Sequence, residues 1–106
     1  MIYNNLTAAA TATATIWDTT ATLTETGTYT VTTDRSCGTL RIILTSNAKC
    51  DRIAATAQVK ENSAGWGETP WLTLDMRFFE MHEITAEDIT EWADRSLQTA
   101  IDQINN

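Results

Sequence analysis

Two pairs of carboxylates are the first candidates for chemistry in this sequence. Glu80 and Glu83 stand three residues apart, as do Asp88 and Glu91. General acid–base catalysis requires burial or a neighbouring charge to move the pKa of one partner towards neutrality. Both pairs lie in a polar, acid-rich stretch around the expected start of a helix, where burial is not expected. The pairs therefore do not predict catalysis.

A nucleophile and a base occur only as scattered residues. Ser36, Cys37 and the single histidine, His82, have no Gly-x-Ser-x-Gly motif, helix-start cysteine or orienting motif beside them. His82 is expected to be an ordinary histidine at the surface or at a strand end. Gly65 and Gly67 do not form a phosphate loop, because lysine is absent from their segment. We predict that the chain is not an enzyme.

The two cysteines could form a disulfide only in an oxidising compartment. Cys37 and Cys50 enclose twelve residues, and a disulfide closing that loop would stabilise the fold by about 3 kcal/mol. Residues 1–5 have no cationic start and no apolar run after them, so no secretory signal is recognised. We expect two free thiols in a cytoplasmic protein. With one histidine and no CxxC or HxxxH spacing, neither a metal site nor a cofactor is predicted.

The formal net charge of −7 arises entirely in the second half of the chain. Residues 1–53 carry four acids and four bases, whereas residues 54–106 carry ten acids and three bases. Phosphate contacts need Lys or Arg, so direct binding to DNA, RNA or an acidic membrane is disfavoured. The same charge favours a basic protein surface, including one that normally holds nucleic acid. The alternative is a solvated acidic face that serves only solubility.

The acids that could form such a binding surface lead from the last expected strand into the first turns of the helix. They are Asp75, Glu80, Glu83, Glu87, Asp88, Glu91 and Asp94. The helix dipole accounts for Glu87 and Asp88 without any partner, and it accounts for the others less well. Trp66 and Trp71, on and beside a glycine-rich loop, could instead anchor a partner or stack on a sugar. Packing of one or both onto the core is the alternative.

Threonine alternation predicts strands in the N-terminal third. Every even position from Thr20 to Thr32 is threonine, and a period of two in a β-branched residue favours strands. The strands are expected near residues 7–17, 19–25 and 28–33. Glu25-Thr26-Gly27 predicts a hairpin turn, because glycine adopts the positive φ of a tight reversal. The alanines of residues 8–14 also favour a helix, which competes with the first of these strands.

Three further strands are predicted at residues 39–45, 52–61 and 71–81, each with alternating apolar residues. In the last strand one face comprises Leu72, Leu74, Met76 and Phe78, and the other comprises Thr73, Asp75 and Arg77. Residues 62–70 contain two glycines and the only proline, and are expected to form a loop.

A C-terminal helix is predicted over residues 85–104. Thr85 can cap it, Asp88 completes a variant of the capping box, and Ile84 with Ile89 are spaced as a hydrophobic staple. Residues at three- and four-residue spacing form one largely apolar stripe: Ile89, Trp92, Ala93, Ser96, Leu97, Ala100, Ile101 and Ile104. This stripe predicts that the helix packs on the sheet.

These elements predict a single α+β domain over residues 1–106, with a mainly antiparallel sheet of five or six strands in residues 1–82 and one helix packed on it. The stretch from Leu23 to Val31 resembles the leucine, turn, Gly-x-Tyr segment of many immunoglobulin-like and jelly-roll domains. The helical C-terminus departs from those folds, so no functional residues are carried over.

Two hypotheses of different class follow for the function. In its small size, acidity and lack of a catalytic motif, the chain resembles the phage-encoded anti-CRISPR and DNA-mimic inhibitors of host defence. That resemblance implies a non-enzymatic protein that blocks a basic, nucleic-acid-binding site on a partner in the host cytoplasm. The alternative is a structural or recognition β module, virion-associated or glycan- or protein-binding, that uses the threonine-rich sheet with Trp66 and Trp71.

Overall fold

The computed structural model describes residues 6–25, 27–35, 38–46, 52–61, 71–80 and 85–105. A short helix, α1 (Leu6–Ile16), precedes five strands and a long helix. The strands are β1 (Thr22–Leu23), β2 (Tyr29–Arg35), β3 (Gly38–Ser46), β4 (Arg52–Glu61) and β5 (Leu72–Glu80), and the long helix is α2 (Ala86–Asn105).

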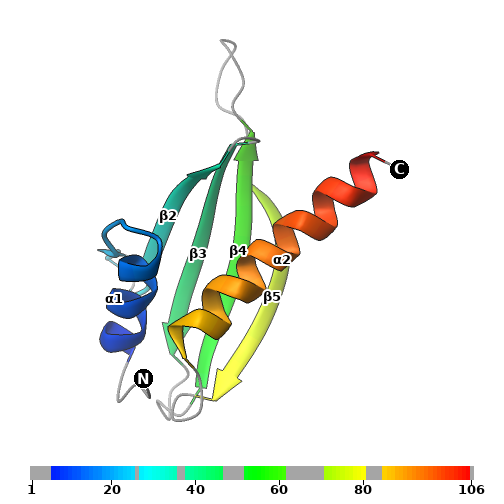
Figure 1. The fold of residues 1–106 in the computed structure, drawn as a ribbon. Coiled ribbons are helices and arrows are strands. Elements are labelled where there is room, and N and C mark those ends of the chain that lie inside the picture. Colours follow the sequence, from blue (N-terminus) through cyan, green and yellow to red (C-terminus); the bar gives the residue numbers. More distant parts are fainter. Residues whose placement is uncertain are drawn as a thin grey trace.

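The strands form one antiparallel sheet in the order β1-β2-β3-β4-β5, so each strand pairs with its neighbours in sequence. Both helices lie on the same face of this sheet (Figure 1). There, α1 contacts β2 and β3, α2 contacts β4 and β5, and the helices contact each other. The α+β prediction is confirmed, with α1 as an additional element. We call the face on which both helices lie the helix face. The other face, on which no helix of the described chain lies, is called the open face.

The core lies between the sheet and the helices. Alternate residues of β3 and β4 face the helices and are almost completely buried: Leu40, Ile42, Leu44, Ile53, Ala55, Ala57 and Val59. From α2, Ile89 and Ala93 are fully buried against this layer. The burial patterns predicted for these two strands are therefore confirmed. On the helix, burial is confirmed for Ile89, Trp92, Ala93 and Leu97, whereas the side chain of Ile104 lies outside the described ones.

The strand predicted at residues 7–17 is wrong, because these residues form α1. The alanine content favours a helix, and Ala9, Ala10 and Ala14 line its buried side. Threonine is accommodated because its hydroxyl can bond within the helix. The Oγ1 of Thr13 donates to the carbonyl of Ala9 at 2.8 Å, so this buried hydroxyl has a hydrogen-bond partner. Local hydrogen bonding and burial therefore override the two-residue alternation.

The hairpin predicted around Gly27 is confirmed, although its first strand is much shorter than predicted. Only Thr22–Leu23 of residues 19–25 pairs with β2. The N–H of Thr24 donates to the carbonyl of Thr28 at 2.8 Å, and Gly27 adopts a φ of 82°. Glycine is suited to this turn because it has no Cβ to oppose a positive φ.

The faces predicted for the last strand are wrong in part. A bulge at Leu74 interrupts the pairing of β5 with β4, so the alternation shifts there by one position. Met76 and Phe78 consequently lie on the open face, where they are 68% and 67% exposed. Phe79, on the helix face, is buried instead. The apolar series predicted to lie on one face of the strand is divided between the two faces of the sheet.

The capping box predicted for the C-terminal helix is confirmed. The N–H of Asp88 donates to Thr85 Oγ1, and the N–H of Thr85 donates to Asp88 Oδ2, both at 3.2 Å. The staple residue Ile84 and the loop predicted at residues 62–70 lie outside the described residues. No helix of the described residues has the length and apolar character needed to cross a membrane.

Candidate protein-binding surfaces

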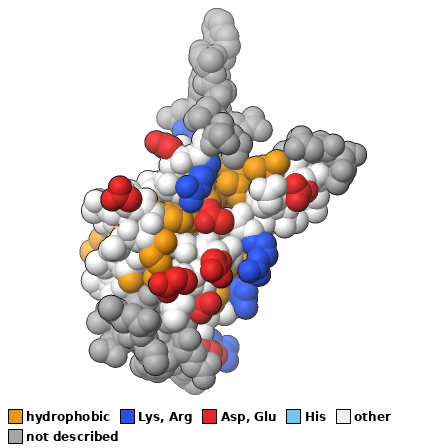
Figure 2. Space-filling view, viewed as in Figure 1, with side chains coloured by type: hydrophobic (Ala, Val, Ile, Leu, Met, Phe, Trp, Pro, Cys, Tyr) orange, Lys and Arg blue, Asp and Glu red, His pale blue; other side chains and the backbone are white. Residues whose placement is uncertain are grey.

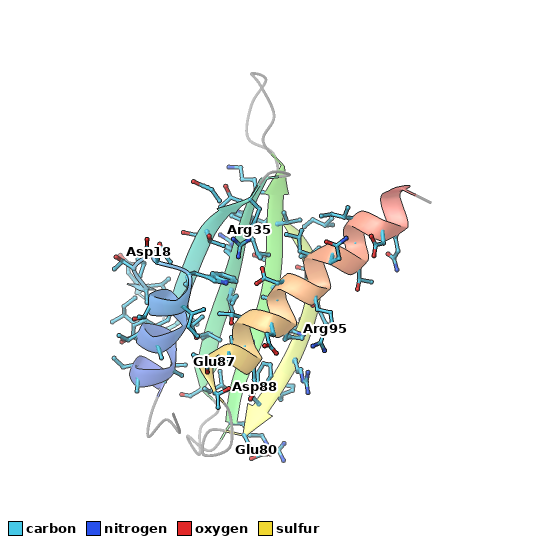
Figure 3. The ribbon with its side chains drawn as sticks, in the orientation of Figure 1. Asp18, Arg35, Glu80, Glu87, Asp88 and Arg95 are labelled. Carbon is cyan, nitrogen blue, oxygen red and sulfur yellow. The ribbon has the colours of Figure 1, made fainter. Side chains whose placement is uncertain are left out.

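Four acids lie on the exposed side of the first turns of α2: Glu87, Asp88, Glu91 and Asp94. Positions i, i+4 and i+7 share one side of a helix, so Glu87, Glu91 and Asp94 form a line about 10 Å long. We call these three residues the acidic line. Figure 2 shows acidic side chains gathered over this part of the molecule, and Figure 3 places Glu87 and Asp88 at the start of α2.

Two of the four helix acids also stabilise the fold. Asp88 belongs to the capping box, and Asp94 Oδ1 lies 3.0 Å from Arg35 Nη2 of β2. Within the described chain, the side chains of Glu87 and Glu91 make neither a hydrogen bond nor an ion pair. These two carboxylates are therefore the ones most readily available to a partner.

The acids of β5 belong to a different environment. Asp75 Oδ2 accepts the indole N–H of Trp92 at 2.8 Å, and its Oδ1 accepts the backbone N–H of Met76 at 2.9 Å. Glu80 Oε1 lies 3.1 Å from Arg52 Nε at the end of the sheet. The predicted acidic block is thus divided into a line on α2 and internally bonded acids on β5, while Glu83 lies outside the described residues.

Trp71 lies next to β5 and does not present a free aromatic platform. The guanidinium carbon of Arg41 is 3.8 Å from the centre of its ring, and Lys60 Nζ is 6.0 Å from it. Partial burial lowers the pKa of Arg41 from its ordinary value, because the charged guanidinium loses hydration. Trp66, the second predicted anchor, lies outside the described residues.

The open face contains an apolar strip formed by Met76 and Phe78, which were predicted to share one face of the strand with Leu72 and Leu74. Met76 and Phe78 are next to Thr56 and Ala54 of β4, respectively, in the sheet pairing. Exposed apolar side chains that lie together add to the apolar surface available to a partner. The consecutive phenylalanines Phe78 and Phe79 could have indicated this strip, because alternation along a strand sends one of the pair to each face.

A polar cleft of about 350 Å³ lies between α2 and β5. Arg77 and Arg95 line it together with Asp88 and Glu91, and the rings of Phe79 and Trp92 line it as well. Arg95 lies on the β5 side of α2 (Figure 3). The acidic line is therefore bordered by two cations, and its negative potential is strongest away from β5.

No group of three or more His, Cys, Asp or Glu side chains within the described ranges is placed to hold a metal ion. Ser36, Cys37, Cys50 and His82, which were considered for a nucleophile, a disulfide or a metal, lie outside those ranges. Comparisons of the chain with protein-family models, curated proteins and solved structures gave no significant match.

Proposed function

We propose that this chain is a non-enzymatic inhibitor that acts in the host cytoplasm by protein binding. Its acidic line occupies a basic surface of a partner protein that otherwise holds nucleic acid. The observation that carries the proposal is the alignment of Glu87 and Glu91, both exposed and without a side-chain partner among the described residues, with the exposed Asp94.

Rigidity of the acidic line supports this role. The capping box fixes the first turn of α2, and the pair of Asp94 with Arg35 ties the helix to β2. The backbone positions of the three acids are therefore fixed before a partner arrives, which reduces the entropy lost on binding. Negative charges on a rigid rod attract a cationic groove and raise the association rate through long-range steering.

A recognition module remains the second candidate function, and the apolar strip on the open face favours it. Met76 and Phe78 offer an apolar contact, and Trp71 with Arg41 offers an aromatic–cation pair. A partner bound there would be held by apolar burial, so its affinity would depend little on salt.

Affinity capture from a host lysate, followed by mass spectrometry and direct binding measurements, tests the proposal. We expect the partner to be a basic nucleic-acid-binding protein that releases its nucleic acid when the chain binds. Raising the salt from 0.15 M to 1 M shortens the Debye length from about 8 Å to about 3 Å and should weaken the complex steeply. Glu87→Lys combined with Glu91→Lys should abolish binding.

The matched control is Glu25→Lys combined with Asp102→Lys. Both acids are exposed, and the control changes the net charge by the same amount away from the acidic line. It should retain most of the affinity. Equal losses in both double variants would show that only net charge matters. Binding that survives the Glu87 and Glu91 reversal but is lost on Trp71→Ala or Phe78→Ala would reject the inhibitor proposal in favour of the recognition module.

A further inference from the structure

The outer edge of β5 pairs with no strand of the described chain, because β5 is the last strand of the sheet. Such an edge presents backbone N–H and C=O groups that can pair with a strand of another molecule. Beside this edge lie Met76 and Phe78, the two exposed apolar residues of the open-face strip. We propose that two copies of this chain associate through β5, paired antiparallel about a twofold axis, to form one continuous sheet.

The charges of β5 select the register of this pairing. In a symmetric antiparallel pair, one residue faces its own copy across the axis. With the axis at Met76, Asp75 of each copy lies opposite Arg77 of the other, which gives two pairs of opposite charge. An axis at Asp75 or at Arg77 would bring like charges together, and an axis at Phe78 would form neither pair. The segment Asp75-Met76-Arg77 is therefore complementary to itself.

Asp75 is the residue that must change partners on association. In the single chain its Oδ1 accepts the N–H of Met76, and its Oδ2 accepts the indole N–H of Trp92. On pairing, the Met76 N–H donates to the Met76 carbonyl of the second copy. Asp75 Oδ1 is then free to accept from Arg77 of the second copy, while the bond from Trp92 is kept. Every backbone donor released by the exchange regains an acceptor.

The position of α2 also suits an added strand. The C-terminal end of α2 projects past β5, so it extends over the space beside the sheet edge (Figure 1). Beneath it, Leu74 and Asp75 of β5 line a recess of about 230 Å³ with Ser96 and Thr99 of the helix. A strand added to β5 would thus be flanked on the helix face as the other strands are. The acidic lines remain free, so this association does not depend on the proposed inhibitor function.

Light scattering or sedimentation of the full chain over a wide concentration range measures the association. We expect the mass to rise with concentration from the 11.7 kDa of one chain towards twice that value. Met76→Lys sets two cations against each other at the axis and should raise the dissociation constant roughly tenfold or more. Leu23→Lys is the matched control: Leu23 is 57% exposed on β1, at the opposite edge, and its change should leave the constant unaltered.

Charge exchange tests the register. Arg77→Asp alone places like charges opposite each other and should also raise the dissociation constant roughly tenfold. Combining it with Asp75→Arg restores complementarity and should recover the dimer. Because Asp75→Arg removes the acceptor of the Trp92 indole, circular dichroism of each variant verifies that it is folded.

Cross-linking tests the axis directly. In a Cys37→Ser, Cys50→Ser background, Met76→Cys brings two thiols together across the axis, where facing Cα atoms lie about 5.5 Å apart and a disulfide can close. We expect rapid oxidation to a linked dimer with Met76→Cys and none with Leu23→Cys. The mass of one chain at every concentration would overturn the proposal. A dimer that tolerates Met76→Lys and does not cross-link at residue 76 would overturn it equally.

Discussion

Phe79 lies on the helix face of β5 with 6% of its surface exposed, whereas its neighbour Phe78 lies on the open face with 67% exposed. The two residues share a strand, a residue type and almost the same sequence context. Alternation places them on opposite faces, and α2 covers only the face of Phe79, whose ring packs edge to face against Trp92, with centroids 5.6 Å apart. The helices, and not the strand pattern, decide which face of this sheet becomes the core.

The two faces also differ in how they are built. On the helix face, small residues such as Ala55 and Ala57 lie beneath the helices and leave room for their side chains. The open face is stabilised by polar cross-strand contacts. Arg41 Nε donates to Gln58 Oε1 at 2.8 Å, and Gln58 Nε2 donates to Thr73 Oγ1 at 3.1 Å. Apolar burial therefore stabilises the helix face, whereas polar cross-strand bonds and exposed apolar side chains characterise the open face.

The largest expected effect is the difference in stability between alanine variants of the two phenylalanines. Phe79→Ala should lower the free energy of unfolding by about 3 to 5 kcal/mol, because it removes a buried ring and leaves a cavity beside Trp92. Phe78→Ala should change it by no more than about 0.5 kcal/mol, since the ring is exposed. Urea denaturation of dilute protein measures both values.

Near-equal losses in the two variants would contradict the assignment of faces. Met76→Ala provides a second open-face control, because Met76 is as exposed as Phe78. It should also leave the unfolding midpoint nearly unchanged.

A smaller effect tests whether the polar contacts of the open face contribute to stability. Trp71→Ala removes the ring on which the Arg41 guanidinium lies and should cost about 1 kcal/mol. Arg41→Ala should cost a similar amount, and the double variant should cost less than the sum of the two single changes. Additive losses in this double-mutant cycle would show that the two side chains do not interact.

Sequence patterns predicted α2, β3 and β4 because local and tertiary signals agree there. The capping residues Thr85 and Asp88 fix the start of α2, and the three- and four-residue spacing fixes its buried side. In β3 and β4, one helix-covered face demands strict alternation, which the sequence shows. Propensity, pattern and packing all lead to the same structure in these elements.

The prediction was wrong where one of those signals was missing. In α1, threonine alternation is also compatible with a helix once the hydroxyls bond to the preceding turn, as Thr13 shows. In β5, a single bulge at Leu74 reverses the faces, and nothing local in the sequence specifies it. The division of the acidic block follows from tertiary contacts, because the bonds of Asp75 to Trp92 and of Asp94 to Arg35 join residues distant in sequence.

The smallest expected effect concerns the turn by which the chain leaves the helix face after α1. Asp18 adopts a φ of 53°, the N–H of Thr19 donates to the carbonyl of Ala14, and the N–H of Asp18 donates to that of Thr15. These bonds form a Schellman motif, in which glycine is the preferred residue at the position of Asp18. The carboxylate of Asp18 also lies at the negative end of the helix dipole.

Asp18→Gly should therefore raise the free energy of unfolding by about 0.5 kcal/mol. Glycine removes the strain of the left-handed conformation and the unfavourable charge, and together these gains exceed the cost of the entropy that glycine adds to the unfolded chain. Asp18→Asn removes the charge while keeping a residue that tolerates positive φ, so it should give a smaller gain. Thermal denaturation measures both. A loss of stability with glycine would mean that the Asp18 side chain stabilises the exit of α1, and that α1 is held on the helix face by more than its alanine packing.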